Sequence, residues 1–130
     1  MDYNLCDYNT VKKILSAHGF NFSKALGQNF IIDDTVCPAM ADMLNVDEST
    51  GVLEVGPGVG VLTKELCKRA GKVVSVELDE RLYPVLEQTL ADYDNFELVK
   101  GDVMKIDLEQ LIAEKFADCK TVKVCANLPY

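Results

Sequence analysis

The sequence of 130 residues contains no tryptophan, a single histidine and no pair of cysteines with the C-x-x-C spacing. Its five cysteines are an odd number, so we expect reduced and mostly buried thiols and no metal site. No apolar run approaches the roughly 18 residues that a membrane span needs, and Met1 is followed by acidic Asp2 rather than by a basic and apolar leader. These absences predict a cytoplasmic protein without a membrane partner.

Basic residues are few, since 13 lysines and arginines face 21 acidic residues and the net charge is −8. This charge repels a phosphate backbone and excludes a general nucleic-acid binder. The first thirty residues are slightly basic, which leaves a local RNA contact open there. The length suits one domain with one modest core, and the ordinary apolar content of 48% excludes disorder.

Strand and helix patterns alternate along most of the chain. Short runs rich in β-branched residues predict strands over 52–55, 72–77, 96–100 and 121–126. Apolar residues at helical spacing predict helices over 9–18, 62–70, 80–93 and 108–116, and a further helix, capped by Asp33 or Asp34, that carries Val36, Met40, Met43 and Leu44. Because Pro84 lacks a backbone N–H, we expect the helix predicted over 80–93 to begin at this proline or to bend there. This alternation predicts an α/β fold with a parallel, doubly wound sheet.

A glycine turn follows the first strand and carries the clearest functional signal. Gly56, Gly58 and Gly60 join that strand to a helix, as in nucleotide sites where a Cβ would block the ligand. Val61 stands where a dinucleotide site prefers a small residue, which disfavours NAD. Glu77 ends the next strand, where a carboxylate could accept the hydroxyls of a ribose.

Two more polar positions follow the third and fourth strands. Asp102 could accept a hydrogen bond from the amino group of adenine, or it could simply cap the next turn. The sequence Asn127-Leu128-Pro129-Tyr130 follows the fourth strand. Since parallel strands end at the same edge of the sheet, these residues are expected to share one ligand-binding edge.

The Asn127-Leu128-Pro129-Tyr130 segment resembles the Asn/Asp-Pro-Pro-Tyr/Phe motif of S-adenosylmethionine-dependent methyltransferases that modify amino groups on bases. Together with Leu26-Gly27-Gln28-Asn29-Phe30, the glycine turn, Glu77 and Gly101-Asp102, it resembles the ribosomal RNA adenine N6,N6-dimethyltransferase family, and within it the bacterial enzymes that act on small-subunit RNA. The resemblance implies a Rossmann-like methyltransferase fold, S-adenosylmethionine as cofactor, and ribosomal RNA of the small subunit as partner.

The resemblance also assigns roles to individual residues. It places Asn29 and Ile31 at the methionine part of the cofactor, Gly56 and Gly58 at its backbone contact, Glu77 at the ribose, Asp102 at the adenine, and Asn127 between the cofactor and the target amine. The oxygen of the Asn127 side chain and the Leu128 carbonyl would accept the N–H bonds of the adenine N6, and Tyr130 would stack on the base. We therefore predict Asn127, Leu128 and Tyr130 as catalytic residues.

The family sheet has seven strands and a following helical domain, so the chain is expected to be a fragment truncated after its fourth strand. We expect residues 1–30 to form an N-terminal helix and a loop over the cofactor, and residues 31–130 to form a partial methyltransferase domain. The open edge of the fourth strand predicts self-association. Three alternatives remain: a large-subunit RNA methyltransferase of the macrolide-resistance type, an inactive S-adenosylmethionine-binding module, and a nicotinamide-dependent oxidoreductase.

Overall fold

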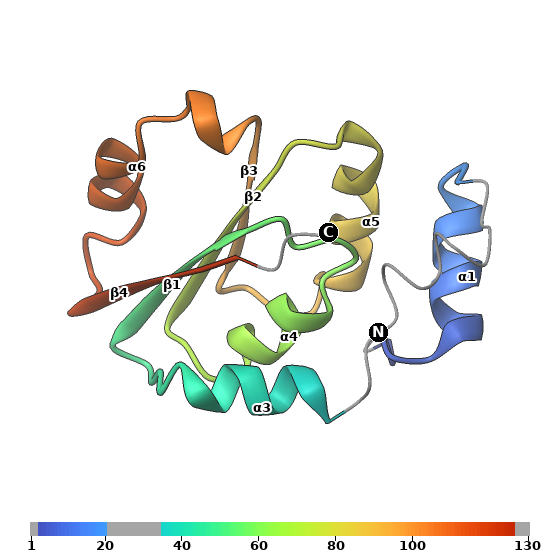
Figure 1. Ribbon diagram of the computed structural model, residues 1–130, viewed down its shortest axis with the longest axis horizontal. Coiled ribbons are helices and arrows are strands. Elements are labelled where there is room, and N and C mark those ends of the chain that lie inside the picture. The colour runs from blue at the N-terminus through green and yellow to red at the C-terminus, as the bar shows by residue number, and fades with distance from the viewer. Residues whose placement is uncertain (1–2, 21–34, 127–130) are drawn as a thin grey trace.

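A sheet of four parallel strands forms the centre of the computed structural model, which describes residues 3–20 and 35–126 (Figure 1). The strands lie in the order β3-β2-β1-β4, and each pairs with its neighbours in parallel register. Their bounds are Thr50–Val55 for β1, Lys72–Glu77 for β2, Phe96–Lys100 for β3 and Thr121–Ala126 for β4. The predicted ranges of the last three strands are confirmed, and β1 begins two residues earlier than the pattern indicated.

Helices cover both faces of the sheet, which confirms the doubly wound arrangement (Figure 1). The helical segments are α1 (Tyr8–Ala17), α3 (Val36–Met43), α4 (Val61–Cys67), η1 (Glu80–Leu82), α5 (Tyr83–Thr89), η2 (Val103–Lys105) and α6 (Leu108–Lys115). One core cluster joins α1, α3, α4 and α5 to Val52 and Val73 of the sheet. A smaller cluster joins α6 to Leu53 and Val74, which point to the other face because side chains alternate along a strand.

The predicted apolar face of α3 is wrong in part. Val36 and Met43 are 41% and 84% exposed, whereas Cys37 and Ala41 are buried. The helix packs against α4 through these smaller side chains, which allow a close approach of the two helices. The N-cap position is also not the predicted Asp33 or Asp34: it is Thr35, whose side chain makes no capping hydrogen bond.

Proline determines where the helix after β2 begins. The residues before Pro84 form the single 3₁₀ turn η1, and Pro84 lies in the first turn of α5, where its missing N–H costs no helical hydrogen bond. The α-helix thus begins at Tyr83, one residue before the proline where a start was predicted, and the predicted range of 80–93 shortens to a 3₁₀ turn followed by α5.

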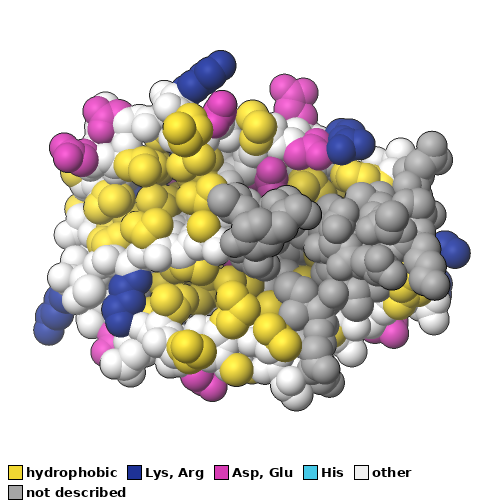
Figure 2. Space-filling model, viewed as in Figure 1, with side chains coloured by type: hydrophobic (Ala, Val, Ile, Leu, Met, Phe, Trp, Pro, Cys, Tyr) yellow, Lys and Arg dark blue, Asp and Glu magenta, His cyan; other side chains and the backbone are white. Residues whose placement is uncertain are grey.

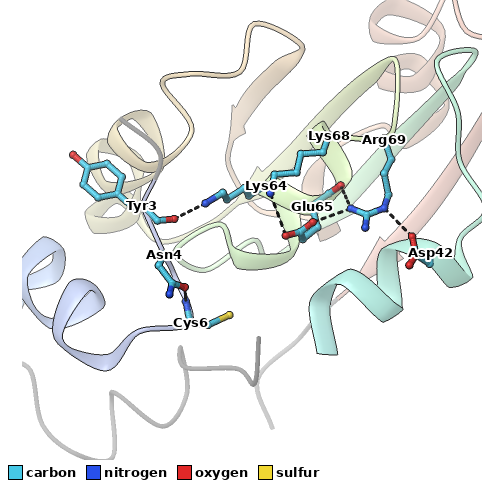
Figure 3. A network of polar contacts seen from close by, with 8 residues as sticks. All are labelled: Tyr3, Asn4, Cys6, Asp42, Lys64, Glu65, Lys68 and Arg69. Carbon is cyan, nitrogen blue, oxygen red and sulfur yellow. Dashed lines mark hydrogen bonds and ion pairs between the residues drawn. The ribbon is translucent and has the colours of Figure 1, made fainter. Parts of the chain in front are cut away.

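Polar contacts fasten α4 to its neighbours along its solvent side (Figure 3). Arg69 donates to the carboxylate of Asp42 on α3 at 2.9 Å and to Glu65 one helical turn earlier at 2.8 Å. In the middle of the helix, Lys64 donates to the main-chain oxygen of Tyr3. The N-terminal segment and α3 are thus both tied to the helix that follows the glycine turn.

The cysteines of the described residues are free thiols, as predicted. Cys37 and Cys67 are buried, and Cys6, Cys119 and Cys125 are half-buried. Burial raises the pKa of Cys37 and of Cys67 to about 12, and that of Cys125 to about 11. These three thiols therefore stay protonated at neutral pH. Over the described ranges, every helix is too short or too polar to cross a membrane.

Candidate cofactor site

Hydrogen bonds between the strand ends bring three predicted site residues to one edge of the sheet. The N–H of Gly56, after β1, donates to the carbonyl oxygen of Val76 at 3.0 Å. The N–H of Gly101, after β3, donates to the carbonyl oxygen of Glu77 at 3.0 Å. Gly56, Glu77 and Asp102 therefore follow one another along the carboxyl ends of β1, β2 and β3, where parallel α/β sheets bind their ligands.

The glycine turn has a backbone that only glycine adopts without strain. Gly56, Gly58 and Gly60 have φ values of +74°, +62° and +96°. A Cβ at Gly60 would lie 3.2 Å from the hydroxyl of Thr89 on α5. That hydroxyl also donates to the carbonyl oxygen of Val59 at 2.9 Å, so α5 holds the turn in place. The sequence patterns did not indicate this role of Thr89, because the contact joins residues that are distant in the chain.

The Glu77 carboxylate is held in a fixed position at the end of β2. The residue is 8% exposed, and its Oε2 accepts the N–H of Asp79 at 3.0 Å. Asp79 is fixed in turn by Arg81, whose guanidinium donates to both carboxylate oxygens at 3.0 and 2.8 Å and lowers the pKa of Asp79. Among the described residues, Asp79 is the only one that donates to the carboxylate of Glu77, which leaves this carboxylate capacity to accept hydroxyl groups.

Asp102 caps the turn that follows β3. Its Oδ1 accepts the N–H of Met104 at 2.9 Å, so the capping role that the sequence left open is confirmed, and the side chain is half-buried. Met104 and Leu78 are 87% and 65% exposed. Each of these apolar side chains lies within two residues of one of the two carboxylates. The edge thus offers apolar surface beside its acceptors.

A buried carboxyl group lies next to the glycine turn. Glu54 is 0% exposed, and its Oε1 accepts hydrogen bonds from the hydroxyls of Thr63 on α4 and, at 2.8 Å, of Ser75 on β2. Burial, and to a lesser extent repulsion by Glu77, raises the pKa of Glu54 to about 7, although the two hydrogen bonds act in the opposite direction. A glutamate inside an otherwise apolar strand was the available signal for this residue.

The remaining predicted site residues, Asn29, Ile31, Asn127, Leu128 and Tyr130, lie outside the described residues. The register nevertheless pairs Val55 with Ala126, so β4 ends beside the start of the glycine turn. Among the described histidine, cysteine and acidic side chains, no group of three could hold a metal ion.

This fold and these strand ends define a class: the Rossmann-like fold of S-adenosylmethionine-dependent methyltransferases. A crystal structure of the 23S rRNA methyltransferase ErmE superposes with a TM-score of 0.58 and is 27% identical, covering 77% of this chain and 48% of that one. A dimethyladenosine transferase from Plasmodium falciparum superposes with a TM-score of 0.53 at 29% identity, covering 72% of this chain and 32% of that one.

Sequence comparison then identifies the family. The model of the family described as ribosomal RNA adenine dimethylase matches residues 19–130. A relative from Bacillus pumilus, the ribosomal RNA small subunit methyltransferase A, is 51% identical over 119 residues, which are 92% of this chain and 41% of the relative. The chain belongs to the ribosomal RNA adenine dimethylase family, and it spans about two fifths of the length of that relative.

Proposed function

We propose that the chain is the S-adenosylmethionine-binding part of an enzyme that dimethylates adenine N6 in small-subunit (16S) ribosomal RNA. The observation that carries the proposal is the row of Gly56, Glu77 and Asp102 along one sheet edge, in a chain of the ribosomal RNA adenine dimethylase family. The glycine turn would receive the methionine part of the cofactor, Glu77 the ribose and Asp102 the adenine. Exposed Leu78 and Met104 offer apolar surface beside an aromatic base.

The proposed methyl transfer requires positioning of the target amine rather than an ionisable side chain. Following the family resemblance, the Asn127 side-chain oxygen and the Leu128 carbonyl would accept the two N–H bonds of the target amine and aim its nitrogen at the methyl group. Bound S-adenosylmethionine would supply the methyl group, and the amine would give up one proton to the solvent for each of the two methyl groups that it receives. Tyr130 would stack on the unpaired base and hold it in that position. Asn29 and Ile31 would contact the methionine part.

A calorimetric titration of the chain with S-adenosylmethionine tests the cofactor site. Glu77→Gln keeps an oxygen for the Asp79 N–H but loses the charge, so we expect roughly tenfold to hundredfold weaker binding, from a loss of about 1.5–3 kcal/mol. Glu80→Gln, at an exposed position three residues further on, is the matched control and should bind normally. Competition by S-adenosylhomocysteine but not by NADH would exclude the nicotinamide alternative. A folded chain that does not bind would refute the site.

Transfer of a labelled methyl group tests the substrate, in a protein that carries this chain at the length of its relatives. We expect small-subunit RNA to be labelled in preference to large-subunit RNA, because the similarity to the small-subunit relative is 51% identity whereas that to the 23S enzyme is 27%. Asn127→Ala should abolish transfer and leave most cofactor affinity intact. Preferential labelling of large-subunit RNA would instead support the macrolide-resistance alternative.

The free side of β4 supports a second proposal, which is self-association of the chain through this strand. In the described sheet β4 pairs with β1 only, and Val124 is 60% exposed. Figure 2 shows hydrophobic side chains gathered on both sides of this strand. Sedimentation should reveal a concentration-dependent dimer that Val124→Lys weakens. Met104→Lys, a change at an exposed apolar residue beyond β3, is the control, and a monomer at all concentrations would refute the proposal.

A further inference from the structure

Of the buried ionisable side chains in the described part of the chain, Glu54 lies near the glycine turn and has no part in the proposed roles. Its carboxyl lies in the layer between the sheet and α4, where the hydroxyls of Thr63 and Ser75 both donate to the same oxygen, Oε1. The other oxygen, Oε2, is fully buried and has no hydrogen-bond partner among the described residues. An unpartnered carboxylate oxygen inside a protein is costly, so its presence requires an explanation.

Among the described helices and strands, no positively charged group acts on this carboxyl. The titratable groups that interact with it electrostatically are Glu77 on β2 and the thiols of Cys37 on α3, Cys67 on α4 and Cys125 on β4. Lysine and arginine are absent from this set within the described residues. Residues 3–20 and 35–126 therefore supply no cation that would balance an ionised Glu54.

The cofactor of the proposed function would supply that charge. S-adenosylmethionine carries a sulfonium and an ammonium group against one carboxylate, so its methionine end is a net cation. Glu54 lies two residues before Gly56, where the methionine end is proposed to bind. It also interacts electrostatically with Glu77, where the ribose is proposed to bind. A cation placed against this edge favours the ionised form of a nearby carboxyl.

We propose that Glu54 is a proton-linked positioning residue of the cofactor site, which holds a proton in the empty protein and releases it to the solvent when the cationic cofactor binds. The O–H bond of the carboxyl group breaks, and the positive charge of the cofactor replaces that of the proton. This inference rests on the proposed function, since it requires S-adenosylmethionine at the glycine turn. Ionised Glu54 would then keep its two hydroxyl partners on α4 and β2 and so hold the base of the turn.

The test is calorimetric titration of the chain in buffers that differ in ionisation enthalpy, at about pH 6, 7 and 8. We expect proton release near neutral pH, and an affinity up to about tenfold lower at pH 6 than at pH 8 for a group that titrates near 7. Glu54→Gln should bind with no proton release and a flat pH profile. Glu87→Gln, an exposed carboxyl on α5, should behave as the unmodified chain.

A second ligand makes the test independent of any variant. S-adenosylhomocysteine lacks the sulfonium charge, so it should release fewer protons from the unmodified chain than S-adenosylmethionine does. Equal release by both ligands, binding without release, or release that persists in folded Glu54→Gln would overturn the inference and leave the proposed function standing. No binding at any pH would overturn both.

Discussion

The buried carboxyl of Glu54 gives the free energy of unfolding a pH dependence whose sign can be worked out. Its pKa rises from 4.5 to about 7 on folding, mainly through burial, so the folded chain binds this proton more tightly than the unfolded chain. The stabilising contribution is complete below pH 4.5 and is lost as the pH rises through 7. A difference of about 2.5 pH units at about 1.4 kcal/mol each amounts to about 3–4 kcal/mol.

Glu54→Gln isolates this contribution. The amide oxygen can still accept from Thr63 and Ser75, but no charge is buried at any pH. Relative to the unmodified chain, the variant should therefore gain about 2–3 kcal/mol between pH 5 and pH 8. Urea unfolding followed by circular dichroism measures this, and Glu87→Gln is the exposed control. A stability difference between variant and unmodified chain that stays constant from pH 5 to pH 8 would refute the reasoning.

Two further substitutions test packing around the sheet. Gly71→Ala would place a Cβ 2.1 Å from the main-chain oxygen of Glu48, so it should cost about 1–3 kcal/mol and lower the urea midpoint. Asn95→Ala removes an amide that donates to two carbonyl oxygens at the end of α4, at 2.9 and 3.0 Å, so thermal unfolding should show a loss of about 1–3 kcal/mol. Asn95→Asp should lower the melting temperature more than Asn95→Ala does, because its carboxylate would face these oxygens. A melting temperature equal to that of the unmodified chain would contradict the role of the substituted residue.

The strands were the most predictable part of the fold. Short β-branched runs bounded by glycine, aspartate or asparagine indicated β2, β3 and β4 with their observed limits. Of these three strands, only β2 is buried along nearly its whole length, so the apolar and β-branched composition predicted the strands better than it predicted their burial. The face of α3 was less predictable. Its apolar residues extend around the helix, and only the position of α4 determines that Cys37 and Ala41 are buried while Met43 is exposed.

The described part of the candidate site also contains some residues whose position could be predicted and others whose position could not. The shared position of Gly56, Glu77 and Asp102 at one edge of the sheet could be predicted, because parallel topology brings strand ends together regardless of how the layers pack. Thr89 and Glu54 could not be placed, because their partners Val59 and Ser75 are 30 and 21 positions away in the sequence. Their roles depend on how helices are laid on the sheet, which local periodicity does not encode.

The position of Glu54 depends both on the register of the strands and on the packing of a helix against the sheet. In the register of the sheet it lies between Ser75 and Cys125, and α4 brings Thr63 against it, so polar groups from four elements meet inside an apolar layer. A valine at this position would avoid the desolvation of a carboxyl, and stability alone therefore does not explain the glutamate. Its place two residues before Gly56 does offer a reason: the charge that weakens the empty fold is the charge that a cationic cofactor would stabilise.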